Sequence, residues 1–251
     1  MQFVAVIVPA APMRAEASHR SEMVSQLLFG EKAVVMARKG DFTKVKSLHD
    51  NYEGWVQTTQ LTSVTKHFIQ KKETGYVDKN GVIAYLNDTP MPLSVGTPIY
   101  SLRCIGQYKV RYKRGRKSGN DYTTFNAEAI QSLVMQYLNV GYLWGGRSSF
   151  GVDCSGLVQN VLKFFGKKLP RDASQQAREG TLIEFLPMAQ CGDLAFFDNE
   201  DGVITHVGIL LDSNTIIHAS GRVHIDPIDN EGIINREINL RTHHLRIIKR
   251  F

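Results

Sequence analysis

The sequence predicts an α+β protein in which two small β-barrels precede a domain of mixed helices and strands. Short strand-like segments alternate with turn residues over roughly the first hundred residues. Two amphipathic helical segments follow, and apolar strand-like segments occupy the last part of the chain. Helices followed by an antiparallel set of strands are typical of an α+β domain.

Composition restricts the possible functions. The chain has 251 residues and a formal net charge of +6, which fits one to three small domains of ordinary globular composition. Because no nucleic-acid recognition motif accompanies this modest charge, we expect no nucleic-acid partner. Three cysteines without a C-x-x-C pair indicate neither a disulfide framework nor a zinc site. We therefore expect a reduced compartment, with no cofactor and no metal.

The N-terminal segment Phe3–Val8 is apolar, but no Lys or Arg precedes it and Pro9 interrupts it. We interpret it as a first β-strand rather than a signal peptide. No apolar run approaches the ~20 residues of a membrane span. The expectation is a cytoplasmic protein with no membrane partner, acting as a monomer.

Hairpin signals place the first barrel within residues 1–63. The apolar run Ala33–Ala37 leads through the turn Arg38–Asp41 into the alternating segment Phe42–Lys46. A weaker version of the same pattern recurs within residues 64–116, which we expect to form a second barrel.

A linker is expected next, because Lys109–Asn120 is basic and then rich in Gly, Ser and Asn. An anion-binding patch is the alternative interpretation. The third domain then spans residues 117–251. Its first amphipathic helix is indicated by Ile130, Leu133, Val134, Tyr137 and Leu138. Asn126 can cap that helix, and a second helix is expected over Cys154–Phe165. Strands follow at Asp193–Phe197, His206–Leu211 and Thr215–Ala219.

Cys154 stands where the second predicted helix begins. Backbone N–H groups there lack intrahelical partners and the macrodipole is positive, so we expect the nucleophilic thiolate to be favoured. Gly151 and Gly156 allow a substrate backbone to approach closely. The N–H of Asp153 or of Cys154 is a candidate oxyanion donor. An inert buried cysteine is the alternative.

Two histidines flank a predicted turn at Asp212–Asn214. If the hairpin is centred on Asp212 or Ser213, His206 and His218 share one face of the sheet and lie about 5–8 Å apart. A loop centred between the last two turn residues would put them on opposite faces. On one face they would form a thiol–imidazole–imidazole line with Cys154. The alternative is that each is a core or edge histidine with a satisfied hydrogen bond.

Five ordered motifs resemble those of the NlpC-like murein peptidases, which are papain-like cysteine peptidases that cut bacterial cell-wall peptides. The motifs are Tyr142–Gln159, Leu169–Gln176, Gly192–Asp198, Thr205–Leu211 and Ile217–Gly221. The preceding region resembles the paired bacterial SH3-like domains found before such catalytic domains. That similarity lies in Ser25–Glu31, Lys39–Val45 and Asn51–Val56.

The resemblance implies a papain-like catalytic domain with Cys154 as the nucleophile, His206 as the base and His218 as the orienting third residue. Tyr142 resembles the tyrosine whose hydroxyl lies near the oxyanion, with a packing role as the alternative. The residues that flank the nucleophile resemble substrate contacts: Asp153 and Ser155.

The most similar subgroup comprises the γ-D-glutamyl-L-diamino-acid endopeptidases, which remove L-Ala-γ-D-Glu from a murein stem peptide. The resemblance implies that Asp172 helps to bind a free amino terminus, together with a tyrosine and an acidic residue of the first SH3-like domain. Tyr52 matches the tyrosine. Glu22 is the residue that we align with the acidic residue of the family. Glu16 is the alternative, because this loop aligns loosely with the family pattern. Ordinary surface positions are the alternative for all of these.

The expected function is therefore cleavage of the γ-D-Glu–L-diamino acid bond in murein-derived peptides with a free L-Ala, during cell-wall recycling. Two alternatives are a secreted hydrolase of intact, N-acylated murein and a non-catalytic wall-binding protein. Acyl transfer to an amine shares the acyl-enzyme step and stays open. We expect Cys104 and Cys191 to be structural, and His224 and His243–His244 to be surface or strand residues.

Overall fold

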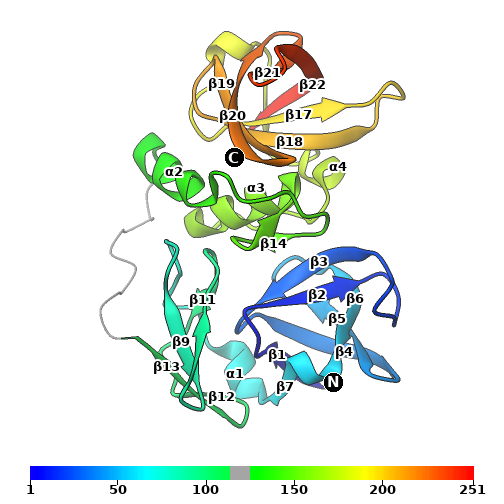
Figure 1. Ribbon diagram of the computed structural model, residues 1–251, viewed down its shortest axis with the longest axis vertical. Helices are drawn as coiled ribbons and strands as arrows, with labels where there is room; N and C mark the ends of the chain where they lie inside the picture. The colour runs from blue at the N-terminus through cyan, green and yellow to red at the C-terminus, as the bar shows by residue number, and fades with distance from the viewer. Residues whose placement is uncertain (114–124) are drawn as a thin grey trace. The chain divides into compact units, whose positions relative to one another are not determined.

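The structure is a computed structural model that describes residues 1–113 and 125–251 (Figure 1). The chain forms two compact units. The first comprises Met1–Asp121 with Trp144–Phe150, and the second comprises Tyr122–Leu143 with Gly151–Phe251. Both expected barrels fall within the first unit. The boundary expected between residues 63 and 64 stays a prediction.

Seven strands form the first sheet, in the order β3-β2-β6-β5-β4-β1-β7. They are β1 (Phe3–Val6), β2 (Ala10–Arg14), β3 (Met23–Leu28), β4 (Lys32–Lys39), β5 (Phe42–Ser47), β6 (Glu53–Gln57) and β7 (Leu61–Val64), with a 3₁₀ turn at Thr58–Gln60 before the last. The expected hairpin forms, since Lys39 pairs with Phe42 across the turn. Gly40 adopts a φ of 54° there, which glycine tolerates without strain.

The second strand region is less regular than the expected barrel. It holds a four-stranded sheet in the order β10-β9-β13-β12 and a separate pair, β11 with β8. The elements are α1 (Lys66–Gln70), β8 (Gly75–Tyr76), β9 (Ile83–Leu86), β10 (Thr89–Pro92), β11 (Pro98–Ile99), β12 (Cys104–Ile105) and β13 (Tyr108–Tyr112). The sequence pattern missed β10 because two of its residues are prolines, which an edge strand accommodates. Residues 114–120 of the expected linker lie outside the described residues.

A shared core explains why these two regions form one unit. One apolar cluster of the second region, which includes Val77 and Tyr100, also contains Ala5 and Phe29 from the first sheet. The Tyr100 hydroxyl donates to the carbonyl of Gly30 at 3.2 Å. Both sheets bury side chains in this cluster, while the first sheet also has a separate cluster of its own that includes Val6, Met13 and Val45.

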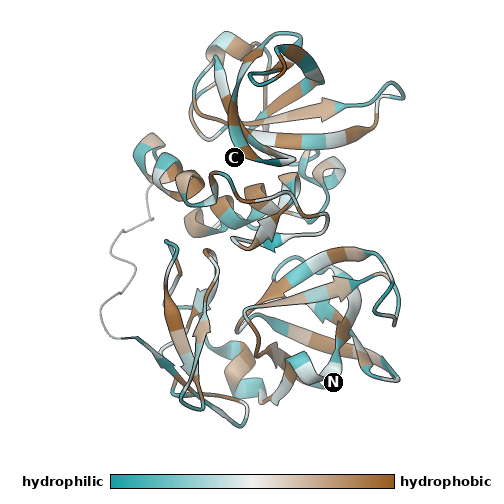
Figure 2. Cartoon of the chain, in the orientation of Figure 1, coloured by the Kyte–Doolittle hydropathy of each residue, from teal (hydrophilic) through white to brown (hydrophobic). Residues whose placement is uncertain are grey.

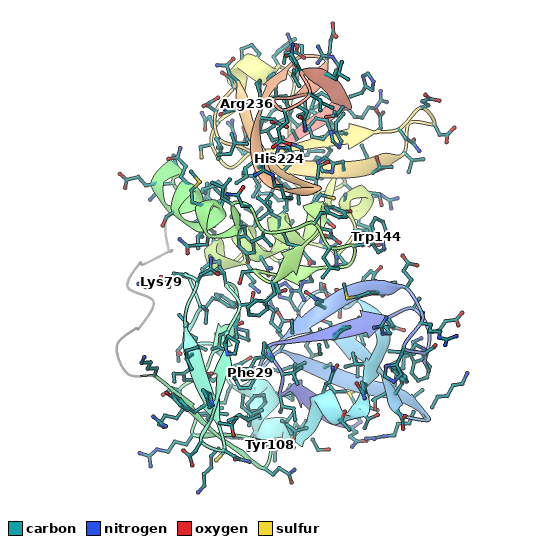
Figure 3. The ribbon with its side chains drawn as sticks, viewed as in Figure 1. Phe29, Lys79, Tyr108, Trp144, His224 and Arg236 are labelled. Atoms are coloured by element: carbon teal, nitrogen blue, oxygen red, sulfur yellow. The ribbon has the colours of Figure 1, made fainter. Side chains whose placement is uncertain are left out.

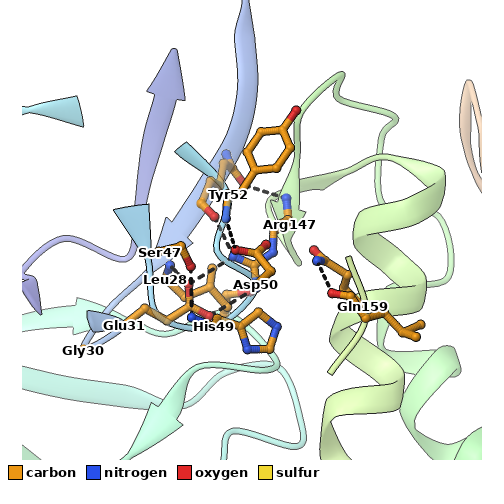
Figure 4. A network of polar contacts seen from close by, with 12 residues as sticks. Leu28, Gly30, Glu31, Ser47, His49, Asp50, Tyr52, Arg147 and Gln159 are labelled. Carbon is orange, nitrogen blue, oxygen red and sulfur yellow. Dashed lines mark hydrogen bonds and ion pairs between the residues drawn. The ribbon is translucent and has the colours of Figure 1, made fainter. Parts of the chain in front are cut away.

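Segment 144–150 belongs to the first unit although it follows the first catalytic-domain helix in sequence. Arg147 is fully buried there and pairs with the carboxylate of Glu31 at 3.1 and 3.2 Å (Figure 4). The Arg147 guanidinium also donates to the Gln26 carbonyl at 2.7 Å, and Ser149 N–H donates to Ser94 Oγ at 2.8 Å. These contacts fix the segment that immediately precedes the predicted nucleophile.

Strands of the second unit close into a six-stranded barrel, β22-β17-β18-β19-β20-β21, because β21 also pairs with β22. The strands are β17 (Leu194–Asp198), β18 (Ile204–Leu210), β19 (Thr215–Ser220), β20 (Arg222–Asp229), β21 (Gly232–Asn235) and β22 (Leu240–Arg250), with β16 (Thr181–Ile183) added at the edge. Hydrophobic residues run along these strands (Figure 2). The expected strands match β17, β18 and β19, whereas β20, β21 and β22 were not anticipated.

Helices pack against this barrel. They are α2 (Ala127–Val134), α3 (Cys154–Leu162) and α4 (Ala173–Gln176). Three 3₁₀ turns lie at Met135–Tyr137, Lys163–Phe165 and Leu186–Met188. A short pair of strands is formed by β14 (Arg147–Ser148) and β15 (Gly151–Val152). Helix α3 contacts β18 and β19. Asn126 caps α2 as predicted, since its side chain accepts from Ala129 N–H at 2.9 Å. Within the described residues, no helix is long and apolar enough to cross a membrane.

Candidate active site

Cys154 is the first residue of α3, as the sequence predicted. The helix begins here because Asp153 is its N-cap, and the Asp153 carboxylate accepts from Gly156 N–H at 2.7 Å. The Cys154 side chain is 7% exposed. Its sulfur accepts a hydrogen bond from the backbone N–H of Val207, which follows His206 on β18. The thiol therefore lies beside the strand that carries the predicted base.

The two predicted histidines share one face of the β18–β19 hairpin. Gly208 pairs with His218, so the hairpin is centred on Ser213 and His206 lies diagonally across from His218. His206 Nε2 and His218 Nδ1 are 2.9 Å apart. The Asp212 carboxylate fixes the turn, because it accepts from Asn214 and Thr215 N–H. The same-face geometry predicted from the turn is confirmed.

The protonation states differ from the expectation of a resting thiolate. Burial raises the pKa of the Cys154 thiol to about 11, and the neighbouring Asp153 carboxylate adds to this rise, while hydrogen bonds from Val207 and Ser155 N–H act in the opposite direction. Burial also holds the pKa of His206 well below its usual range. The helix start alone therefore does not decide the charge of this sulfur, because desolvation outweighs it. Both shifts favour the thiol of Cys154 and the neutral imidazole of His206 over an ion pair.

Tyr142 lies next to this pair, within the second unit. Its N–H donates to the Gly221 carbonyl at 2.9 Å, and it bridges to Val152 just before the nucleophile. Burial, together with the nearby Cys154 and Asp153 groups, raises the pKa of the Tyr142 phenol to about 12. The phenol therefore keeps its proton near neutral pH and can donate it in a hydrogen bond.

Asp153 and Ser155, the predicted substrate contacts, are buried and bound to Arg171. The Arg171 guanidinium pairs with both oxygens of the Asp153 carboxylate and donates to Ser155 Oγ at 2.7 Å. Both side chains thus brace the start of α3. A direct role in substrate binding stays a prediction for them.

The three residues predicted to bind an amino terminus belong to different units. Asp172 is the N-cap residue of α4 in the second unit, although its side chain makes no capping hydrogen bond. Tyr52 is half-buried against the core of the first sheet. Glu22 is exposed and accepts a hydrogen bond from Trp144 Nε1 at 2.6 Å. Glu16, its competitor, is exposed in the same loop between β2 and β3.

Three further residues lie near the histidine pair. His224 was expected to be a surface or strand residue, and it lies buried on strand β20, with Nδ1 at 3.3 Å from the Asp226 carboxylate. His243, on β22, stacks on the His206 ring with centroids 4.1 Å apart. Asp226, which the sequence analysis did not consider, contacts His218 Nε2 at 3.2 Å. The alternation in Val223–Ile228 was the available signal, since it places His224 and Asp226 on one face.

The donor atoms of two groups lie close enough to raise the question of a metal ion: His206, His218 and His243, and His218, His224 and Asp226. Their geometry suits a hydrogen-bonded chain better. The His206 and His243 rings are stacked at an interplanar angle of 29°, so their in-plane lone pairs do not converge on one point. The remaining contacts are donor–acceptor pairs at hydrogen-bond distance.

The other two cysteines differ from each other. Cys104 is exposed on β12, and the expectation that it is structural stays a prediction. Cys191 is half-buried, and burial together with the carboxylates of Asp212 and Asp193 raises its pKa to about 11. Neither stands at the start of a helix.

A thiol that begins a helix, beside an imidazole oriented by a second buried ring, can pass its proton to that imidazole and attack a carbonyl carbon. This chemistry defines a cysteine peptidase. The chain belongs to the NlpC/P60 family. Residues 139–242 match the NlpC/P60 family, and residues 13–61 match the bacterial dipeptidyl-peptidase Sh3 domain.

Curated relatives extend this similarity over most of the chain. It is 31% identical over 214 residues to the gamma-D-glutamyl-L-lysine dipeptidyl-peptidase of Bacillus subtilis (strain 168), a match that covers 78% of this chain and 71% of that protein. The protein of the same name from Bacillus cereus is 29% identical over 258 residues, covering 90% and 77%. The crystal structure of a NlpC/P60 family protein from Bacillus cereus ATCC 10987 superposes with a TM-score of 0.83 at 22% identity, over 99% of both chains. The fold is therefore shared from end to end.

Proposed function

We propose that this peptidase cleaves the bond between γ-D-Glu and the L-diamino acid in murein stem peptides that begin with a free L-Ala. The proposed catalytic activity rests on one observation, the buried and hydrogen-bonded His206–His218 pair beside the thiol of Cys154. The names of the two Bacillus relatives support the choice of bond. A papain-like catalytic domain behind two SH3-like domains is part of the same proposal.

In the proposed mechanism, His206 takes the thiol proton as the sulfur of Cys154 attacks the γ-carbonyl carbon of D-Glu. Because His206 Nε2 faces His218, the nitrogen available to the sulfur is Nδ1. The phenol of Tyr142 donates a hydrogen bond to the oxyanion. His206 then returns the proton to the departing amine of the diamino acid, and water hydrolyses the thioester by the same route in reverse.

We propose that the carboxylates of Asp172 and Glu22, together with the side chain of Tyr52, account for the amine selectivity. An ammonium gains charge-assisted hydrogen bonds from carboxylates, whereas an N-acyl group would leave them without a cationic partner. The bond from Trp144 to Glu22 favours Glu22 over Glu16, because Trp144 lies two residues after Tyr142 in the same motif. We assign the activity to the cytoplasm, where the three free cysteines would stay reduced.

The test compares L-Ala-γ-D-Glu-L-Lys with its N-acetylated form, using mass spectrometry of the products. We expect the free tripeptide to release L-Ala-γ-D-Glu, and acetylation to reduce kcat/KM by about 10-fold or more, since each lost charge-assisted contact is equivalent to about 1.5–3 kcal/mol. Glu22→Gln should reproduce most of this loss on the free substrate, chiefly through KM.

Glu16→Gln is the matched control, because it makes the same change in the same exposed loop, and it should leave KM at the wild-type value. Equal cleavage of the free and acetylated peptides would favour the alternative, a secreted hydrolase of intact N-acylated stems. If Glu16→Gln rather than Glu22→Gln raised KM, the assignment of the acid would be wrong.

A further inference from the structure

Asp226 lies on β20, the second strand beyond the one that carries His206, and is 1% exposed. Its Oδ2 atom contacts His218 Nε2 at 3.2 Å and His224 Nδ1 at 3.3 Å. Its Oδ1 atom accepts a hydrogen bond from the backbone N–H of Arg236 at 3.2 Å. Figure 3 labels His224 and Arg236 within this barrel. The carboxylate thus stands at the inner end of a line that runs through His218 to His206.

The direction of each hydrogen bond along this line follows from the charge at its inner end. Burial would by itself raise the pKa of Asp226, but hydrogen bonds from His218 and Arg236 N–H and the neighbouring histidines bring it below its usual value, so the group is a carboxylate and only accepts. Burial lowers the pKa of His218 despite the opposing effect of Asp226, so the ring is neutral. A neutral ring that donates from Nε2 accepts at Nδ1.

Because His218 Nδ1 accepts, His206 must donate from Nε2 across the 2.9 Å contact. A neutral imidazole that is protonated at Nε2 has its lone pair at Nδ1. That lone pair is the base which the proposed mechanism requires.

We infer that Asp226 is a positioning residue which fixes the tautomer of His218 and thereby selects Nδ1 of His206 as the base for Cys154. The inference rests on the roles proposed above for Cys154 and His206. It adds a fourth member, which touches neither substrate nor sulfur, to the Cys154–His206–His218 group.

The backbone around Asp226 makes Asp226→Asn a directed test. Arg236 N–H needs an acceptor, so the amide oxygen of the asparagine should take the Oδ1 position. The amide nitrogen then replaces Oδ2 and donates toward His218 Nε2. The hydrogen bonds from residue 226 to His218 and from His218 to His206 then both run in the opposite direction. His206 is left protonated at Nδ1, the nitrogen that must act as the base. Asp226→Ala removes the acceptor without introducing a donor, so both neutral tautomers of His218 remain accessible.

We therefore expect Asp226→Asn to lower kcat on the order of 10²-fold or more, with KM within about 3-fold of wild type. Asp226→Ala should lower kcat less, although it leaves a cavity and a larger loss of thermal stability. ¹⁵N spectra of the histidine rings should show His218 protonated at Nε2 in the wild type and at Nδ1 in Asp226→Asn. The substrate is L-Ala-γ-D-Glu-L-Lys, assayed with the full chain.

Asp229→Asn is the matched control, since Asp229 lies on the same strand and its carboxylate binds Arg241 instead. It should keep wild-type kcat and ring tautomers. Wild-type kcat in Asp226→Asn, or a larger loss of kcat in Asp226→Ala than in Asp226→Asn, would overturn the inference. Failure of the proposed function would give a different result, because the wild type would not cleave this substrate or Cys154→Ala would still cleave it. The ring tautomers would test the role of Asp226 in either case.

Discussion

Each unit of this protein buries a polar network, and the two networks differ in kind. In the first unit Arg147, fully buried, is held by the Glu31 carboxylate and the Gln26 carbonyl. In the second unit neutral rings of His206 and His218 are aligned by one carboxylate, Asp226. A guanidinium does not lose its proton in proteins, so Arg147 keeps its charge at all working pH values. A neutral imidazole can accept a proton at one ring nitrogen and donate one from the other, which makes the second network suitable for proton transfer.

The largest effect is expected from removing the sulfur. Cys154→Ala should lower kcat/KM on the order of 10⁴-fold or more, since no other group can form the acyl-enzyme. The free energy of unfolding should change by only about 1 kcal/mol, because a single buried atom is lost. Product assays and urea denaturation measure the two effects. Cys104→Ser, at an exposed cysteine, is the control, and a comparable loss of activity there would contradict the assignment of Cys154.

Breaking the network of the first unit should affect stability. Glu31→Gln leaves the buried Arg147 charge without its carboxylate, and we expect a loss of about 3–5 kcal/mol in the free energy of unfolding. Glu53→Gln in the same unit removes an exposed partner of Lys44, and should cost no more than about 1 kcal/mol. Denaturant titration of both variants gives the comparison. Equal losses would mean that the buried Arg147–Glu31 pair stabilises the fold no more than the exposed Lys44–Glu53 pair does.

The smallest effect is a difference in pH dependence between the units. Burial lowers the pKa values of His206 and His218, and with His218 it lowers that of His243 to about 4. The folded state therefore binds fewer protons than the unfolded chain below pH 6.5. Their contribution to stability is complete above about pH 6.5 and is lost as the pH falls toward 4.

Hydrogen exchange at pH 7 and pH 5, corrected for intrinsic rates, can resolve this difference by strand. Protection in β18 and β19 should fall more than protection in β4 and β5. His243→Gln should flatten the fall in the second unit, whereas His67→Gln, at an exposed position in α1, should give the wild-type profile. An equal fall in protection across both units would show that the buried imidazoles do not control the pH dependence of stability.

Sequence patterns were most informative where the structure depends on neighbours along the chain. The helix start at Cys154 follows from the Asp153 cap, and the histidine pairing follows from the turn after Asp212. The positions of Asp226 and His243 near His206 were not predicted, because only closure of the barrel brings their strands to the strand that carries His206. The Arg147–Glu31 pair joins residues far apart in sequence, which no local pattern encodes.

By itself the sequence predicted the α+β fold class, the family, and Cys154 and His206 as the thiol and the imidazole of the site. It could do so because caps, turns and strand alternation act over a few residues. Only the tertiary structure decided the charge of that pair and which further residues support it. Burial and the directions of hydrogen bonds depend on segments that meet in space, and here desolvation of Cys154 outweighs the helix start that the sequence displayed.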